Sequence, residues 1–218
     1  MHRRYLYIKI LLIIISCNNK VEPILPYYNS ANFEPIFIKD KNIVENKIDH
    51  KISDFKFINQ DNNEITENDI SGKIHVANFI FTSCINICPS MTENMKIINN
   101  NFKNNPNVMI LSYSVMPWID DTNKLKKFKD FNKIKSTNWH FLTGKKDEIY
   151  SLARNSYFVE EELGFNRDSS DFLHTEHFIL VDQNKRLRGI YNGTLKLEAK
   201  QVVDDINLLL EYENWDNI

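Results

Sequence analysis

Residues 79–89 read FIFTSCINICP, and most of what can be inferred about this chain starts from them. The apolar residues that open the segment predict a buried strand, and Cys84 and Cys88 follow directly after it. Pro89 favours the first turn of a helix, because its missing N–H group would have no partner there. Both sulfur atoms are therefore expected at a strand-to-helix junction. A helix N-terminus lowers the pKa of a thiol, and thiolates bind soft metals or exchange disulfides.

The segments on either side of this junction alternate between strand and helix. A hairpin is predicted over residues 52–66, around the turn at residues 61–63. Further strands are predicted at 73–81, 108–115, 139–142, 178–181 and 187–191. Helices are predicted at 89–102, at 120–131, from the capping residue Thr143 to about 156, and from about 194 to the end of the domain. This order predicts an α/β protein with a thioredoxin-like fold, in which helices flank a central mixed sheet. The CxxC motif usual for that fold is here one residue wider, CxxxC.

The first residues of the chain predict a secretory signal. Arg3, Arg4 and Lys9 precede or border a short apolar run at residues 10–15, which ends in Ser16-Cys17. The run is too short to span a bilayer as a helix, which needs about 20 apolar residues. Residues 14–17, IISC, resemble a bacterial lipobox, and this resemblance implies cleavage before Cys17 and acylation of its sulfur. An uncleaved hydrophobic anchor is the alternative.

Three regions follow from this interpretation: a signal peptide at 1–16, a lipidated N-terminus and tether at 17–50, and a single domain at 51–214. The tether is rich in Asn, Lys and Pro, and residues 33–38 are a candidate for an added edge strand. The domain is expected outside the cytoplasm of a bacterium, in the cell envelope, anchored to a membrane by lipid on Cys17.

The charge of the chain argues against nucleic-acid binding. The full chain has a formal charge of −2, and loss of the signal leaves 24 basic against 29 acidic residues, a charge of −5. Nucleic-acid binding needs a basic face. The lysines between Lys124 and Lys135 are interleaved with Asp and Phe and predict the solvated side of a helix.

The cysteine count narrows the role of the thiol pair. If Cys17 carries lipid, only Cys84 and Cys88 remain, and one pair in a chain of this length is not a disulfide framework. A structural disulfide is the simplest alternative, but it would close only a small loop and add little stability.

Two sulfurs leave a soft metal site short of ligands, and a histidine is the natural addition. His2 lies in the signal, His50 in a polar segment where solvent exposure is expected, and His75 and His140 within predicted strands. The remaining two, His174 and His177, lie in a predicted loop that leads into the strand at 178–181. From the residues alone, either of these two could reach the thiols.

Two segments resemble the SCO (SenC) family of copper chaperones. Residues 82–89, TSCINICP, resemble the family's TxCxxxCP motif, and His174-Thr175 with residues 178–182, FILVD, resembles its later histidine segment. The similarity extends over about residues 50–212. It implies a thioredoxin-like domain that binds one copper ion, Cu(I) or Cu(II), through Cys84, Cys88 and His174. His177 falls on a position that is usually apolar in the family.

The resemblance also implies a partner protein, and at one position this chain differs from the pattern of the family. The family delivers copper to, or reduces the thiols of, the binuclear copper site of cytochrome c oxidase, so the expected partner is its copper-bearing subunit or another copper protein. Many members have Asp-Pro after the middle strand, where this chain has Met116-Pro117 and acids only at Asp120 and Asp121. Met116 is either a weak soft contact to copper or, more simply, part of the packing of the loop.

Two other functions fit the same residues. A thiol–disulfide oxidoreductase would use Cys84 and Cys88 as its redox-active pair and would need no metal and no His174. A thiol peroxidase would need an activating Arg near its cysteine. Thr82 lies two residues before Cys84, but the sequence offers no clear Arg partner.

Overall fold

The computed structural model describes residues 24–159 and 175–214. Within them, seven strands form one sheet in the order β2-β1-β5-β4-β3-β6-β7. The strands are β1 (Lys56–Asn59), β2 (Glu64–Thr66), β3 (Ile74–Ile80), β4 (Val108–Ser114), β5 (Trp139–Thr143), β6 (His177–Val181) and β7 (Leu187–Asn192). The helices are η1 (Lys41–Ile43), α1 (Val44–Lys47), α2 (Glu67–Ile70), α3 (Ile87–Phe102), α4 (Thr122–Phe131), α5 (Lys146–Asn155) and α6 (Lys196–Asn214).

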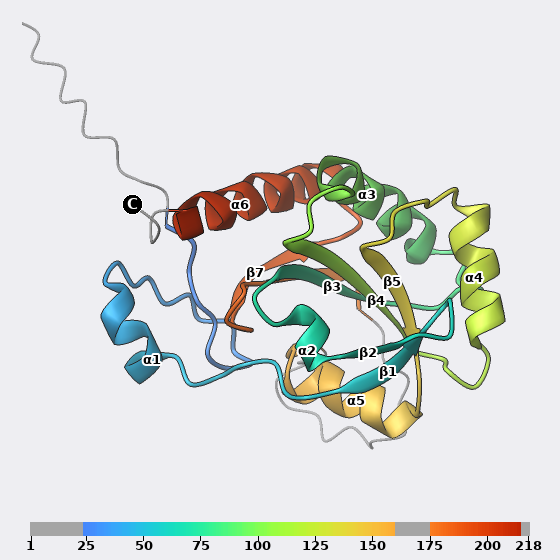
Figure 1. Cartoon of the computed structure of the whole chain (residues 1–218), viewed down its shortest axis with the longest axis horizontal. Coiled ribbons are helices and arrows are strands. Elements are labelled where there is room, and N and C mark those ends of the chain that lie inside the picture. Colours follow the sequence, from blue (N-terminus) through green and yellow to red (C-terminus); the bar gives the residue numbers. More distant parts are fainter. Residues whose placement is uncertain (1–23, 160–174, 215–218) are drawn as a thin grey trace, which may run out of the picture.

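The sheet is mixed, as the thioredoxin-like prediction requires. Strands β3, β4 and β5 are parallel, while β6 runs antiparallel to β3 and β1 runs antiparallel to β5. Helices cover both faces, with α3 and α6 on one face and α5 on the other (Figure 1). The predicted fold class is therefore confirmed. None of the helices in the described ranges combines the length and the apolar character that crossing a membrane requires.

Strand β3 lies inside the sheet, between β4 and β6, and every one of its residues is buried. Ala77 and Phe79 face the core on the α5 side, whereas Val76 and Ile80 face the core beneath α3 and α6. A strand covered on both faces has no polar side to present to solvent, which explains why all of its residues but His75 and Asn78 are apolar. These two buried polar side chains contact the hydroxyl groups of Tyr157 and Ser112.

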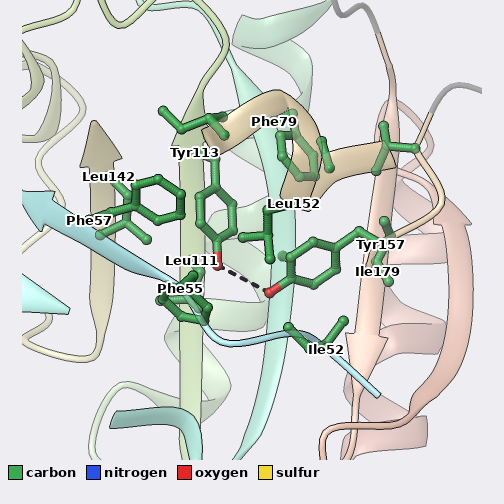
Figure 2. Close-up of a cluster of buried hydrophobic side chains, with 14 of the residues drawn as sticks. Ile52, Phe55, Phe57, Phe79, Leu111, Tyr113, Leu142, Leu152, Tyr157 and Ile179 are labelled. Carbon is green, nitrogen blue, oxygen red and sulfur yellow. Dashed lines mark hydrogen bonds between the residues drawn. The ribbon is translucent and has the colours of Figure 1, made fainter. Parts of the chain in front are cut away.

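The core on the α5 side is rich in aromatic rings. Phe79 stacks on Tyr113 with ring centroids 5.3 Å apart, and Phe57 meets the same tyrosine edge-on at 5.7 Å. The hydroxyl groups of Tyr113 and Tyr157 lie 3.1 Å apart within this cluster (Figure 2). The two buried phenol groups therefore serve as hydrogen-bond partners for one another within the apolar cluster.

Two local predictions were wrong. Thr143 does not cap α5, because it is the last residue of β5, where it pairs with Ile58, and the helix begins only at Lys146. Residues 33–38 do not add a strand to the sheet. Only Ile36 among them forms a β-bridge, and its partner is Tyr27, while Tyr28 bridges to Leu187 at the edge strand β7.

Residues 24–50, in the region expected to act as a tether, lie against the domain. They form a lobe on the β7 side of the sheet, blue in Figure 1. Tyr27, Ile38, Val44 and Ile48 make a small buried cluster within it. We call residues 24–50 the N-terminal lobe.

Candidate functional site

The two cysteines lie at the carboxyl end of β3, where the chain turns into α3. The backbone N–H of Cys84 donates to the carbonyl of Phe81 at 3.1 Å, which closes a tight turn just after the strand. Cys88 is the second residue of α3 and is buried, whereas Cys84 is half-buried in the preceding loop. Pro89 lies in the first helical turn, as predicted. Both thiols are free.

The two thiols have opposite electrostatic surroundings. Partial burial raises the pKa of Cys84, but backbone N–H groups of Cys88, Asn86 and Ile87 at the helix start, together with the Cys88 thiol, outweigh it and lower the pKa. The pKa of Cys88 is raised to about 12, chiefly by burial and also by the nearby charges of Cys84 and Asp120, against one backbone hydrogen bond that lowers it. Cys84 is therefore the sulfur that ionises first and the better placed nucleophile.

Asp120 lies beneath the cysteine loop and is fully buried. Its carboxylate accepts hydrogen bonds from the backbone N–H of Thr82 at 3.1 Å, from the Thr82 hydroxyl at 2.5 Å and from the Ser114 hydroxyl at 2.8 Å. The ammonium of Lys124 lies 3.3 Å from the same carboxylate and donates to the Ser83 hydroxyl at 2.8 Å. One buried charge thus ties the loop that precedes Cys84 to the end of β4 and to α4.

Sequence reasoning named Asp120 only as a nearby acid and did not assign it this role. No local signal distinguishes it from Asp121, which caps α4 through a hydrogen bond to the Lys124 backbone N–H. The distinction arises from contacts with Thr82, which lies 38 residues away in the sequence.

Met116 packs against the core cluster on the α5 side, in agreement with the packing interpretation. Its backbone N–H donates to the Ser114 hydroxyl at 3.1 Å. The same hydroxyl donates to Asp120, so the loop that carries Met116 is joined to the hydrogen bonds beneath the thiols.

Three histidines are accounted for by local packing. His50 stacks on Phe158 with ring centroids 4.1 Å apart, so the prediction of a solvated side chain was wrong. His75 is buried in β3 with Nε2 3.0 Å from the Tyr157 hydroxyl, and His140 in β5 has Nδ1 3.2 Å from Asn59 Nδ2. The predicted structural roles of His75 and His140 agree with these positions.

The proposed histidine ligand, His174, lies outside the described residues. His177 begins β6, and its Nδ1 lies 3.1 Å from the hydroxyl of the buried Thr175. The antiparallel register of β3 and β6 pairs Ala77 with Ile179, so the start of β6 lies at the same end of the sheet as the cysteine loop. Within residues 24–159 and 175–214, no three side chains of Cys, His, Asp or Glu form a group able to hold a metal ion.

Comparisons with known proteins assign the chain to a family. The sequence profile of SCO1/SenC matches residues 44–211. A SCO1 protein homolog from Bacillus subtilis (strain 168) is 30% identical over 167 residues, which cover 75% of this chain and 84% of that protein.

Solved structures agree with this match. A SCO1/SenC family lipoprotein from Bacillus anthracis is 29% identical with a TM-score of 0.64, covering 74% of this chain and 95% of its own. BsSco, in which a disulfide switch was identified, is described as a member of the Sco family of cytochrome c oxidase assembly proteins. It is 30% identical with a TM-score of 0.62, and the match covers 73% of this chain and 93% of BsSco. Copper-bound ScoI from Arabidopsis thaliana shares the fold at 24% identity and a TM-score of 0.57, covering 73% and 98%.

Proposed function

The chain belongs to the SCO1/SenC family, and from this premise we propose that it is a copper-binding metallochaperone for the binuclear copper site of cytochrome c oxidase. The 30% identical BsSco is described as a member of a family of cytochrome c oxidase assembly proteins, and a more distant relative has been solved with copper bound. The copper-bearing subunit of the oxidase, or another copper protein, is the partner we propose.

One observation carries this proposal. The two free thiols lie together at the start of α3, at the end of β3, and β6 begins at the same end of the sheet. We assign Cys84, Cys88 and His174 as the ligands of the transported ion. Thiolates suit Cu(I), and an imidazole helps to hold Cu(II). A site of three ligands near the surface can pass its ion to a partner by exchanging one ligand at a time.

Lipid on Cys17 would hold the domain at a membrane surface of the cell envelope, outside the cytoplasm. Two observations support this anchor. Residues 1–17 run from basic residues through an apolar stretch to Ser16-Cys17, and one of the relatives is described as a lipoprotein. Anchoring raises the effective concentration of the chaperone near a membrane-bound recipient.

A second candidate is a thiol–disulfide oxidoreductase that reduces the copper-site cysteines of the recipient. The opposite pKa shifts of Cys84 and Cys88 favour it. The Cys84 thiolate would attack a disulfide of the recipient and release one thiolate, and Cys88 would then give up its proton and attack the mixed disulfide. The recipient would gain two electrons and become a dithiol, and this chain would lose those two electrons as its own thiols are oxidised to a Cys84–Cys88 disulfide.

Anaerobic titration of the reduced domain with Cu(I) and with Cu(II), followed by absorption and metal analysis, tests the first candidate. We expect one copper ion per chain. Cys84→Ser and Cys88→Ser should each abolish binding, and His174→Ala should weaken it at least tenfold. His177→Ala is the matched control, because this histidine lies three residues away, and it should bind copper like the parent.

The same variants separate the two candidates. If His174→Ala binds copper as tightly as the parent, residue 174 is not a ligand. If the parent binds no copper but still reduces a disulfide-bonded copper-site domain, the oxidoreductase function replaces the chaperone function.

A further inference from the structure

The N-terminal lobe, residues 24–50, is joined to the domain by specific contacts. Tyr27 and Ile36 form a two-stranded bridge within it, with reciprocal backbone hydrogen bonds of 2.9 Å. The backbone N–H of Tyr28 donates to the Leu187 carbonyl at 3.1 Å, and that of Ile52, two residues after the lobe, donates to the Lys185 carbonyl at 2.8 Å. The lobe is thus attached at the turn between β6 and β7.

Two buried arginines next to this turn clamp the lobe. The Arg188 guanidinium donates to the carbonyls of Leu25 at 2.9 Å and Pro26 at 3.0 Å, and it lies 3.8 Å from the ring centre of Tyr27. Asp182 lies 3.2 Å from Arg188 and balances its charge. Arg186 in turn forms an ion pair of 2.6 Å with Glu45 of the lobe. The path of the chain is therefore fixed from Leu25 onward.

Because Arg186 and Arg188 hold the lobe, only a short segment separates it from a lipid on Cys17. Cys17 precedes Ile24 by seven residues, which span at most about 25 Å when fully extended. A free segment from Cys17 to His50 could extend over about 110 Å. A lipid on Cys17 would therefore keep the clamped lobe close to the bilayer.

The direction of strand β3 places the thiols far from this lobe. Val181, just before the β6–β7 turn, pairs with His75 at the start of β3, and Gly72 donates to Gln183 within that turn. Cys84 follows the other end of β3. The strand has seven residues and is about 23 Å long. The lobe and the dithiol thus lie at opposite ends of the sheet.

Resting on the proposed lipid at Cys17, we propose that the N-terminal lobe is a bilayer-facing surface that holds the dithiol on the side of the molecule away from the membrane. Phe37 is the side chain that meets the bilayer. It is 64% exposed, and it follows Ile36, whose bridge to Tyr27 places it beside the point where the chain emerges. The recipient is then a domain that projects from the membrane and presents its copper ligands at the height of the thiols.

Nitroxide depth measurements on vesicles test this orientation. The chain from residue 17, with Cys84→Ser and Cys88→Ser, is coupled through Cys17 to a maleimide phospholipid. A ketone-bearing amino acid at position 37, 85 or 131 then receives the nitroxide. Ile85 lies in the cysteine loop, and Phe131 is the matched exposed aromatic control on α4. We expect the ratio of oxygen to nickel-chelate accessibility to be at least threefold higher at position 37 than at the other two.

Clamp variants and a vesicle-free sample complete the test. Arg188→Ala with Arg186→Ala should reduce the difference between positions 37 and 131, while α6 and the sheet keep their circular dichroism. A label at 37 that matches the label at 131 would overturn the proposal, as would burial of position 37 in a dimer without vesicles. Because the lipid is attached chemically, these results do not depend on acylation in the cell or on copper binding.

Discussion

At the scale of single residues, the chemistry of the site follows from the unequal surroundings of two identical side chains. Cys84 faces the first N–H groups of α3, whereas Cys88 is buried one turn later and faces negative charge. This asymmetry suits a site that must first capture an ion or a disulfide with one thiolate and then complete the reaction with the second sulfur.

Asp120→Asn should lower the free energy of unfolding by about 1–3 kcal/mol. The amide has one acceptor oxygen in place of two, so at least one of the buried donors from Thr82 and Ser114 loses its partner. The substitution also removes a negative charge near Cys88, so the pKa of that thiol should fall below about 12. Urea unfolding and the pH dependence of alkylation measure the two effects.

Asp121→Asn is the matched control for this variant. Asp121 is exposed and caps α4, a position where Asn serves about as well as Asp. We expect no change in either measurement. Equal losses of stability in both variants would mean that the carboxylate beneath the loop has no special role.

The residue scale also shows what a sequence reveals and what it conceals. The cysteines could be found because their spacing and the following proline are local signals. Asp120 could not, because its partners come from Thr82, Ser114 and Lys124, which meet only in the folded molecule. His174 as a copper ligand stays a prediction.

At the scale of elements, periodicity predicted the helices well where packing agrees with it. The helical residues Met91, Met95, Ile98 and Phe102 are all buried in α3, as their spacing predicts. The mostly apolar segment 73–81 likewise predicted β3 to within a residue at each end. The errors occurred at connections, where Gly144 and Lys145 separate Thr143 from the helix that it was expected to cap.

Ile98→Ala should lower the free energy of unfolding by about 2–5 kcal/mol, because it opens a cavity where α3 packs on the sheet. Asn100→Ala, on the exposed side of the same helix, should change it by less than about 0.5 kcal/mol. Urea unfolding of both variants gives the comparison. If the two variants lose the same stability, the buried face of α3 does not anchor the helix that carries Cys88.

At the scale of the whole molecule, the placement of the N-terminal lobe shows most clearly why sequence reasoning stops short. Its Asn, Lys and Pro content is typical of a tether, yet Arg186 and Arg188 supply buried partners that local composition does not reveal. The lobe is held by contacts between residues more than 130 positions apart, and such contacts leave no trace in hydrophobic periodicity.

Global stability should depend on pH through two histidines in the sheet. His75 is completely buried, and burial lowers its pKa to about 3 from an ordinary value of 6.5. Its Nε2 contacts the Tyr157 hydroxyl, which in turn meets Tyr113 in the cluster of Figure 2. Burial, together with the charge of Lys129, lowers the pKa of His140 to about 4.

Both histidines stay neutral in the folded chain and gain a proton on unfolding once the pH falls below 6.5. Their stabilisation is therefore complete above pH 6.5 and is lost as the pH falls toward 3–4. At pH 5.0 each histidine should have lost about 2 kcal/mol of stabilisation, since one pKa unit corresponds to about 1.4 kcal/mol.

Urea unfolding at pH 7.5 and 5.0 tests this expectation. Between these two pH values, the free energy of unfolding should decrease less for His75→Gln and for His140→Gln than for the parent, and least for the double variant. A decrease in the double variant equal to that of the parent would show that other groups cause the acid sensitivity.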